Sequence, residues 1–187
     1  MKERILSAIE SSPIIAAVKN DEGLGRILAS DLQVIFVLYG DLCSVGGIVS
    51  RLREAGKYAI VHADLIAGLG PKEVAVDFLA RSGASGIIST RPAFIKRGRE
   101  LGLFTIHRFF VFDSLSLQNV AKSAAASHPD VVEILPGLMP RVIGRVCAAV
   151  RQPVICGGLI EDKGDVMAAL AAGAVAISTT DVAVWGL

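Results

Sequence analysis

Two short segments near the C-terminal end of the chain could bind an anion. The first reads P-V-I-C-G-G-L-I and the second reads A-I-S-T-T. Gly157 and Gly158 would let backbone N–H groups approach an anion closely, because glycine has no Cβ. Ser178 and Thr179 would add hydroxyls and further N–H groups. The two segments together predict a phosphate site, and the competing interpretation is that the glycines only permit a tight turn.

A histidine and an aspartate follow an apolar run in the sequence Y-A-I-V-H-A-D. Side chains alternate along a strand, so His62 and Asp64 are expected to share a face with Ile60. Facing inward, they could hold ligand hydroxyls, act as an acid/base pair, or bind a divalent metal. A structural His–Asp hydrogen bond explains the same residues equally well.

Glu133 lies among apolar residues in V-V-E-I-L-P-G. A buried carboxylate needs a partner, because an unpaired buried charge is costly. Arg108, in the preceding apolar segment, is the expected partner, and Glu133 could in addition accept a substrate hydroxyl. Arg91 follows Ser-Thr and could reach the same ligand.

Covalent and metal chemistry have little support in the sequence. Ser114 reads as a helix cap, since no Ser-His-Asp spacing accompanies it. No catalytic lysine is identified at a strand end, which disfavours Schiff-base chemistry. The chain has three cysteines and no C-x-x-C, so neither a zinc site nor a disulfide framework is indicated. The residues alone therefore support neither covalent catalysis nor a zinc site.

A run of basic residues, Lys96, Arg97 and Arg99, stands on one predicted helix with Arg91 before it. Such a run is usually a solvated face, and an RNA contact is the alternative. The net charge of the chain is only +1, unlike that of a protein coated in basic residues. No RRM or KH motif is present.

Eight short runs rich in valine and isoleucine are typical of strands buried on both faces. They are Ile14–Val18, Val34–Leu38, Tyr58–Val61, Gly86–Ile88, Leu103–Ile106, Val131–Leu135, Val154–Cys156 and Ala174–Ile177. Their alternation with helical segments predicts a compact TIM-type (β/α)8 barrel with short loops, as a single domain over residues 1–187. A doubly wound sheet is the alternative.

Helix signals lie between these runs. Pro71 is expected at the first helical position of one helix, and Thr90 and Ser114 are expected to cap two others. Lys2–Glu10 could form an extra helix before the first strand. Residues 181–186 could form a final helix whose N-terminus faces the anion. Barrel sites lie at the C-terminal ends of the strands, so the polar residues above are expected to meet there.

The hydrophobic fraction is 52% and the mean hydropathy is +0.57, which raises the question of a membrane span. The longest apolar run, Val166–Ile177, is shorter than the roughly 18 residues that suggest a spanning helix. No signal peptide is visible. A soluble cytoplasmic protein without a membrane partner is expected.

The chain resembles the glycerol uptake operon antiterminator family, which consists of bacterial regulators that respond to glycerol 3-phosphate. The stretches that carry the resemblance are H-A-D-L-I-A-G-L-G (62–70), G-I-I-S-T-R-P (86–92), T-I-H-R-F-F-V-F-D-S (105–114), P-D-V-V-E-I-L-P-G-L-M-P-R-V-I (129–143), P-V-I-C-G-G-L-I (153–160) and A-I-S-T-T (176–180), with Trp185 close behind. They span nearly the whole chain, and H-x-D-L-I-x-G-L followed by E-I-L-P-G-x-M-P is the most specific part.

The resemblance implies a barrel that is a regulator and not an enzyme, so no catalytic residue, metal or cofactor is expected. It implies binding of glycerol 3-phosphate and of the leader mRNA of a glycerol operon, which prevents transcription termination, and a homo-oligomer is compatible with it. Gly157, Gly158, Ser178 and Thr179 match where the phosphate should sit, and His62, Asp64 and Glu133 match where glycerol hydroxyls could be held. The competing hypothesis is a small phosphosugar isomerase, epimerase or lyase that uses the same phosphate site.

Overall fold

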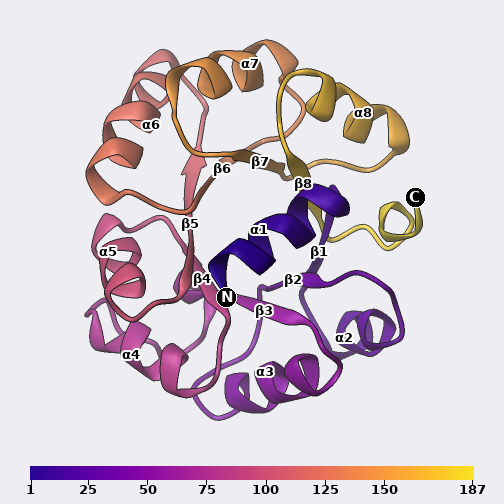
Figure 1. Ribbon diagram of the computed structural model, residues 1–187, viewed down its shortest axis with the longest axis vertical. Helices are drawn as coiled ribbons and strands as arrows, with labels where there is room; N and C mark the ends of the chain where they lie inside the picture. The colour runs from indigo at the N-terminus through magenta and orange to yellow at the C-terminus, as the bar shows by residue number, and fades with distance from the viewer.

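The computed structural model describes residues 1–187 as a closed barrel of eight parallel strands (Figure 1). The strands pair in chain order, and β8 pairs with β1 to close the barrel. They are β1 (Ile14–Val18), β2 (Val34–Val37), β3 (Tyr58–His62), β4 (Gly86–Ser89), β5 (Phe104–Phe110), β6 (Val131–Leu135), β7 (Val154–Gly157) and β8 (Ala176–Thr179). The predicted (β/α)8 barrel is confirmed.

Helices surround the barrel, as the alternation of the sequence predicts. They are α1 (Lys2–Ser11), α2 (Asp21–Leu28), α3 (Val45–Glu54), α4 (Val74–Arg81), α5 (Pro92–Glu100), α6 (Ser114–Ser127), α7 (Pro140–Ala149) and α8 (Lys163–Ala171), with the 3₁₀ helices η1 (Ala63–Leu65) and η2 (Val184–Gly186). None of these helices combines the length and the apolar character that crossing a membrane requires.

Two strands differ from the prediction in ways that affect the site. β5 extends to Phe110, which places Arg108 inside the strand. β8 begins at Ala176, so Ser178 and Thr179 lie within it and do not follow it. The shift arises because Gly173, with φ +107°, ends α8, and the chain needs two more residues to reach its pairing partner β7.

Three helix starts were predicted wrongly. α4 begins at Val74, because short turns of the 3₁₀ type, such as the bond from Ala75 N to Lys72 O, occupy the residues after Pro71. Arg91, not Thr90, precedes Pro92 at the start of α5. Asp113 caps α6 through a capping box with Ser116, so Ser114 is its first helical residue.

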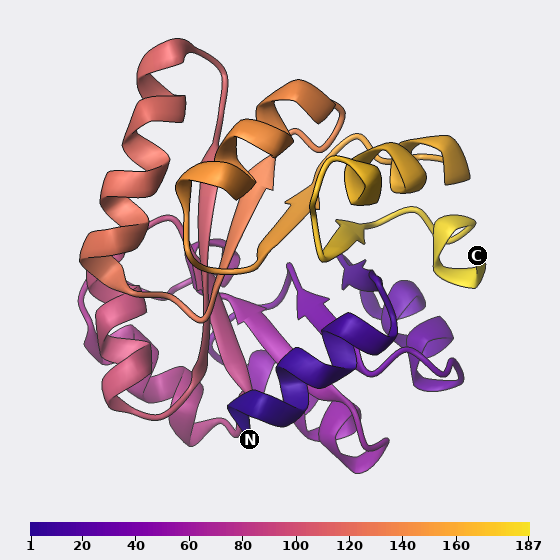
Figure 2. The same cartoon turned by 45° about the horizontal axis from the view of Figure 1, so that its top comes forward.

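The interior of the barrel is filled by alternate side chains of all eight strands. The cluster includes Ile15, Phe36, Ile60 and Ile106, and all are fully buried. α1 lies across the end of the barrel at which the strands begin (Figure 2), and its Ile5, Ala8 and Ile9 join the same cluster. Because apolar side chains fill the interior and α1 covers this end, a polar site is expected at the opposite end, where the strands terminate.

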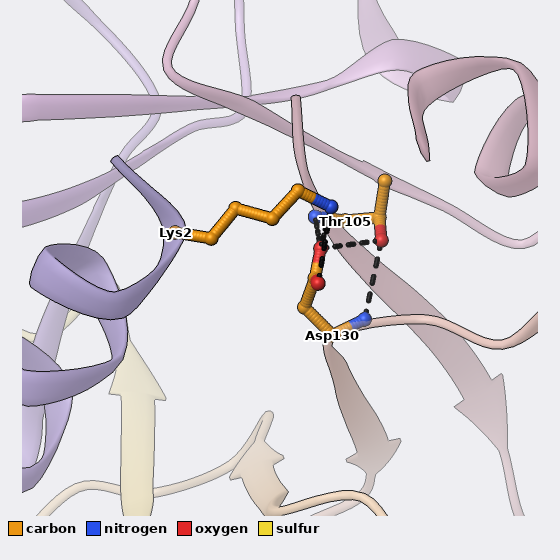
Figure 3. Close-up of polar contacts among 3 residues, drawn as sticks. All are labelled: Lys2, Thr105 and Asp130. Atoms are coloured by element: carbon orange, nitrogen blue, oxygen red, sulfur yellow. Dashed lines mark hydrogen bonds and ion pairs between the residues drawn. The ribbon is translucent and has the colours of Figure 1, made fainter. Parts of the chain in front are cut away.

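Asp130 ties α1 to the barrel (Figure 3). Its carboxylate accepts hydrogen bonds from Lys2 Nζ at 2.8 Å and from both the backbone N and Oγ1 of Thr105 at 2.8 Å. Thr105 Oγ1 in turn accepts from the backbone N of Asp130 at 3.2 Å. One carboxylate thus fixes both the helix and the start of β5.

Replacing Asp130 with alanine is expected to lower the free energy of unfolding by about 1–3 kcal/mol, because the buried Thr105 N–H loses its acceptor. Lys2→Ala removes only the partly exposed ion pair and should cost about 1 kcal/mol or less. Urea denaturation of the two variants measures both effects. Equal losses would show that the ion pair, and not the Thr105 bonds, is the important contact.

Candidate functional site

A cleft of about 520 Å³ opens at the C-terminal ends of the strands. Its lining includes Lys19, Arg108, Leu135, Gly158, Leu159, Ile160, Glu161, Ser178, Thr179, Thr180 and Asp181. The loops that follow β7 and β8 supply most of these residues. The structure therefore brings together the two segments in which the sequence predicts a phosphate site.

The loop after β7 presents several unpaired backbone N–H groups. Gly158 and Leu159 have φ +77° and +62°, both in the left-handed region that only glycine adopts readily. The amides of Gly158, Leu159, Ile160 and Thr180 donate no hydrogen bond within the protein, although all four residues line the cleft. Successive N–H groups held in a turn of this kind form a concavity suited to an anion.

Two cations stand in the same cleft. Lys19 immediately follows β1 and makes no ion pair or hydrogen bond, while Arg108 uses only its Nε and leaves both terminal nitrogens unbonded. No catalytic lysine was expected at a strand end, and the structure places one lysine, Lys19, directly after β1. Lys19 is also the residue that sequence reasoning missed, although its position directly after the run Ile14–Val18 was visible.

Beneath the cleft lies a buried polar network. Arg108 Nε donates to Glu133 Oε2 at 2.6 Å, and Ser178 Oγ donates to Glu133 Oε1 at 2.7 Å, with Glu133 fully buried. This confirms the predicted Arg108–Glu133 pair. A Cβ on Gly157 would overlap Ser178 Oγ and come within 3.0 Å of Glu133 Oε1, so this glycine makes room for the network of the protein itself.

Thr179 organises the loops by its hydroxyl. Its Oγ1 donates to Ile160 O at 2.8 Å and accepts from the backbone N of Asp181 at 3.0 Å. Both predicted hydroxyls, of Ser178 and Thr179, are thus engaged inside the protein, and the unbonded amides are the donors that remain for an anion. The final helix predicted over residues 181–186 is wrong: Asp181 Oδ1 accepts from Ala183 N, and only the 3₁₀ turn η2 follows.

His62 and Asp64 do not form a pair. η1 interrupts the strand after His62, so the predicted alternation ends there. The Asp64 carboxylate accepts from Ser89 Oγ and from the N and Oγ1 of Thr90, and it lies 3.5 Å from Arg91 Nε. Asp64 therefore stabilises the turn between β4 and α5, and both of its carboxylate oxygens accept hydrogen bonds there.

His62 is almost fully buried and its Nδ1 has no hydrogen-bond partner. Burial, assisted by the nearby Arg108 guanidinium, lowers the pKa of His62 to about 4. The imidazole is neutral at physiological pH and cannot serve as a cation for phosphate.

The same shift predicts a loss of stability in acid. The pKa of His62 is lower in the folded protein than the ordinary value of about 6.5 in the unfolded chain, so the unfolded chain binds the proton first. The stabilisation is complete above about pH 6.5 and is lost as the pH falls towards 4, by on the order of 3 kcal/mol in total. Denaturation curves at several pH values should show a smaller acid loss for His62→Gln, and equal losses in both proteins would contradict the assignment.

The basic run on α5 is partly neutralised. Arg97 binds Asp77 of α4 at 2.6 Å and Glu100 at 2.8 Å, while Lys96 and Arg99 remain exposed without partners. Arg91 stacks over the ring of Phe94 at 5.1 Å and does not line the cleft. No group of three or more histidine, cysteine, aspartate or glutamate side chains is placed to hold a metal ion, and the three cysteines are free.

Residues 14–185 match the family described as glycerol-3-phosphate responsive antiterminator. An Escherichia coli (strain K12) protein, named as uncharacterized protein YgcP, is 46% identical over 184 residues, which cover 98% of this chain and 96% of that protein. The glycerol uptake operon antiterminator regulatory protein of Listeria monocytogenes str. 4b F2365 is 32% identical with a TM-score of 0.89, covering 92% of this chain and 94% of that one. A glycerol uptake operon antiterminator-related protein of Thermotoga maritima MSB8 is 30% identical with a TM-score of 0.84, covering 94% and 99%. The chain therefore belongs to the glycerol-3-phosphate responsive antiterminator family.

Proposed function

We propose that this protein is a regulator that binds glycerol 3-phosphate in the cleft between the β7 and β8 loops. In the bound state it recognises the leader mRNA of a glycerol-utilisation operon and prevents transcription termination. The observation that supports the ligand most directly is the meeting of four unbonded backbone amides with two cations, Lys19 and Arg108, in one cleft. Amides and cations of this kind match the oxygens of a phosphate monoester.

We infer that the glycerol part of the ligand lies against the polar network. With the phosphate at the Gly158–Ile160 amides, the hydroxyls face Arg108 and Ser178, which rest on the buried Glu133. His62 offers a neutral nitrogen deeper in the barrel, where Asp64 is already engaged. Glu133 and Asp64 thus act through their neighbours, while Gly158, Ser178 and Arg108 line the cleft itself.

Calorimetric titration with glycerol 3-phosphate tests this proposal, with glycerol and inorganic phosphate as controls. The phosphoester is expected to bind more tightly than either half, because it engages both the amides and the polar network. Equal binding of inorganic phosphate would reduce the cleft to a general anion site. If the folded protein binds none of the three compounds, glycerol 3-phosphate is not its ligand.

Regulation requires that the ligand change the affinity for RNA. Glycerol 3-phosphate must bind the RNA-competent state more tightly than the other state, and RNA must reciprocally tighten ligand binding. Ligand-dependent read-through of a terminator in a purified transcription assay measures this coupling. Unchanged read-through at saturating ligand would contradict it.

An isomerase, epimerase or lyase is less well supported. The acid/base pair such an enzyme would draw from His62 and Asp64 does not form, since Asp64 is turned towards Ser89 and Thr90. Membership of an antiterminator family favours regulation for the same cleft.

A further inference from the structure

One sector of the surface carries more basic than acidic residues. Between residues 112 and 160 the exposed cations are Lys122, Arg141, Arg145 and Arg151, and none makes an ion pair. Two of the three acids of this stretch, Asp130 and Glu133, are paired with Lys2 and Arg108, and the third, Asp113, caps α6 with its carboxylate. The sector thus has four unpaired cations and one exposed carboxylate, on a chain whose net charge is only +1.

Exposed apolar side chains lie beside these cations. Phe112 is 81% exposed, Leu115 is 64% exposed and Phe110 is 53% exposed, all near the start of α6. A groove of about 400 Å³ runs between the β5–α6 loop and α7, and both Phe112 and Arg145 line it. α6 and α7 are neighbours on the outside of the barrel (Figure 1, Figure 2). We call Phe112, Lys122, Arg141 and Arg145 the α6–α7 surface.

We propose that the α6–α7 surface is the place where single-stranded RNA binds, an inference that rests on the proposed function. Arg141 and Arg145, one turn apart on α7, are positioned for consecutive phosphates, and Phe112 offers a flat face on which an unpaired base can stack. The Arg145 guanidinium in the same groove can flank that base.

The excess of positive charge on the α6–α7 surface favours RNA over a protein as its partner. The cores of protein–protein interfaces are depleted in charged residues, whereas single-stranded nucleic acid sites combine cations with aromatic platforms. The three cations of the α6–α7 surface outnumber its one exposed carboxylate, that of Asp113, and complement a polyanion. An apolar protein surface would leave them unpaired.

The basic run on α5 lacks the same combination. Arg97 is held by Asp77 and Glu100, and the aromatic residue of that helix, Phe94, is buried. Lys96 and Arg99 therefore offer charge alone. They provide a matched pair of cations, three residues apart on a neighbouring helix, with which Arg141 and Arg145 can be compared.

The α6–α7 surface is connected to the ligand cleft through backbone contacts. The amide of Gly137, shortly before α7, donates to Gly158 O at 3.1 Å. Leu135 lines the cleft, pairs with Phe110 across the β5–β6 ladder, and lies against Gly158. An anion that draws the Gly158–Ile160 amides inward would act directly on the segment that positions Phe110 and the start of α7.

The test uses fluorescence anisotropy with a labelled, mixed-sequence single-stranded RNA of about twenty nucleotides, at several salt concentrations. The charge-reversed variant Arg141→Glu/Arg145→Glu is expected to bind at least about tenfold more weakly, with a salt slope smaller by roughly 0.7 for each phosphate that is no longer neutralised. Phe112→Ala should weaken binding on the order of tenfold with an unchanged salt slope, because stacking is not a charge effect. The control Lys96→Glu/Arg99→Glu should bind as the unchanged protein does.

The outcomes separate this surface from the proposed function. If RNA affinity is unchanged in the α7 variant, or is lost only in the α5 control, the α6–α7 surface is not the RNA site. The proposal that the protein is an RNA-binding regulator would still stand. No RNA binding by the unchanged protein, with or without glycerol 3-phosphate, overturns both. A Phe112→Ala protein that changes from dimer to monomer in sedimentation, with RNA affinity unaltered, would assign the surface to a second copy of the chain instead.

Discussion

Arg108→Met is expected to lower the free energy of unfolding by about 3–5 kcal/mol, because it leaves the Glu133 carboxylate buried without its cation. Glu133 has no exposure to solvent, and Ser178 is its one remaining hydrogen-bond donor. Met has an unbranched side chain of comparable length, so the loss reflects the missing charge more than a cavity. Urea denaturation, followed by circular dichroism, measures the change.

The double variant Arg108→Met/Glu133→Gln separates the structural role of Arg108 from its ligand role. Glutamine is neutral and can still accept the Ser178 hydroxyl, so most of the stability should return. Affinity for glycerol 3-phosphate should remain low in both variants, because the unbonded terminal nitrogens of Arg108 are missing from the cleft. A double variant that regains ligand affinity together with stability would show that Arg108 only supports the fold.

The sequence predicted the barrel well because strand signals in a parallel barrel are local. Short runs of valine and isoleucine, buried on both faces, are visible without knowing their partners. The Arg108–Glu133 pair was predictable for a similar reason, since a carboxylate among apolar residues requires a cation close by. α3 was harder to specify, because Gly46 and Gly47 in its first turn weaken the helical signal.

The site depended on relations that only the closed barrel establishes. Lys19 gains importance because β1 lies next to β8, so that it faces the loops of residues more than 130 positions away. Asp64 does not share a strand face with His62, as was expected, because one 3₁₀ turn rotates the chain after His62. The hydroxyls of Ser178 and Thr179 donate to acceptors inside the protein, so of the donors expected from the sequence only backbone amides remain for an anion. Sequence patterns give residue types at strand ends, whereas hydrogen-bond partners depend on the neighbours across the barrel.

Gly158→Ala is expected to weaken the binding of glycerol 3-phosphate by on the order of 100-fold, as two hydrogen bonds to a charged group are displaced. Gly158 has φ +77°, a conformation that costs an alanine roughly 1–2 kcal/mol, and its new Cβ would lie 3.3 Å from Leu135 Cδ2. The loop can relieve this strain only by rotating the Gly158 and Leu159 peptides. That rotation turns their N–H groups away from the cleft. Calorimetric titration measures the loss.

Gly102→Ala is the control that distinguishes strain from ligand contact. Gly102 has φ +75° after α5, and an added Cβ there meets no atom within 4 Å. Both variants should therefore lose a similar amount of stability from the backbone, while Gly102→Ala keeps the full affinity for glycerol 3-phosphate. If both variants bind the ligand equally well, the Gly158–Ile160 amides are not its donors. The paired glycines at the end of β7 would then serve the fold alone, Gly157 by admitting Ser178 beside Glu133 and Gly158 by turning the chain.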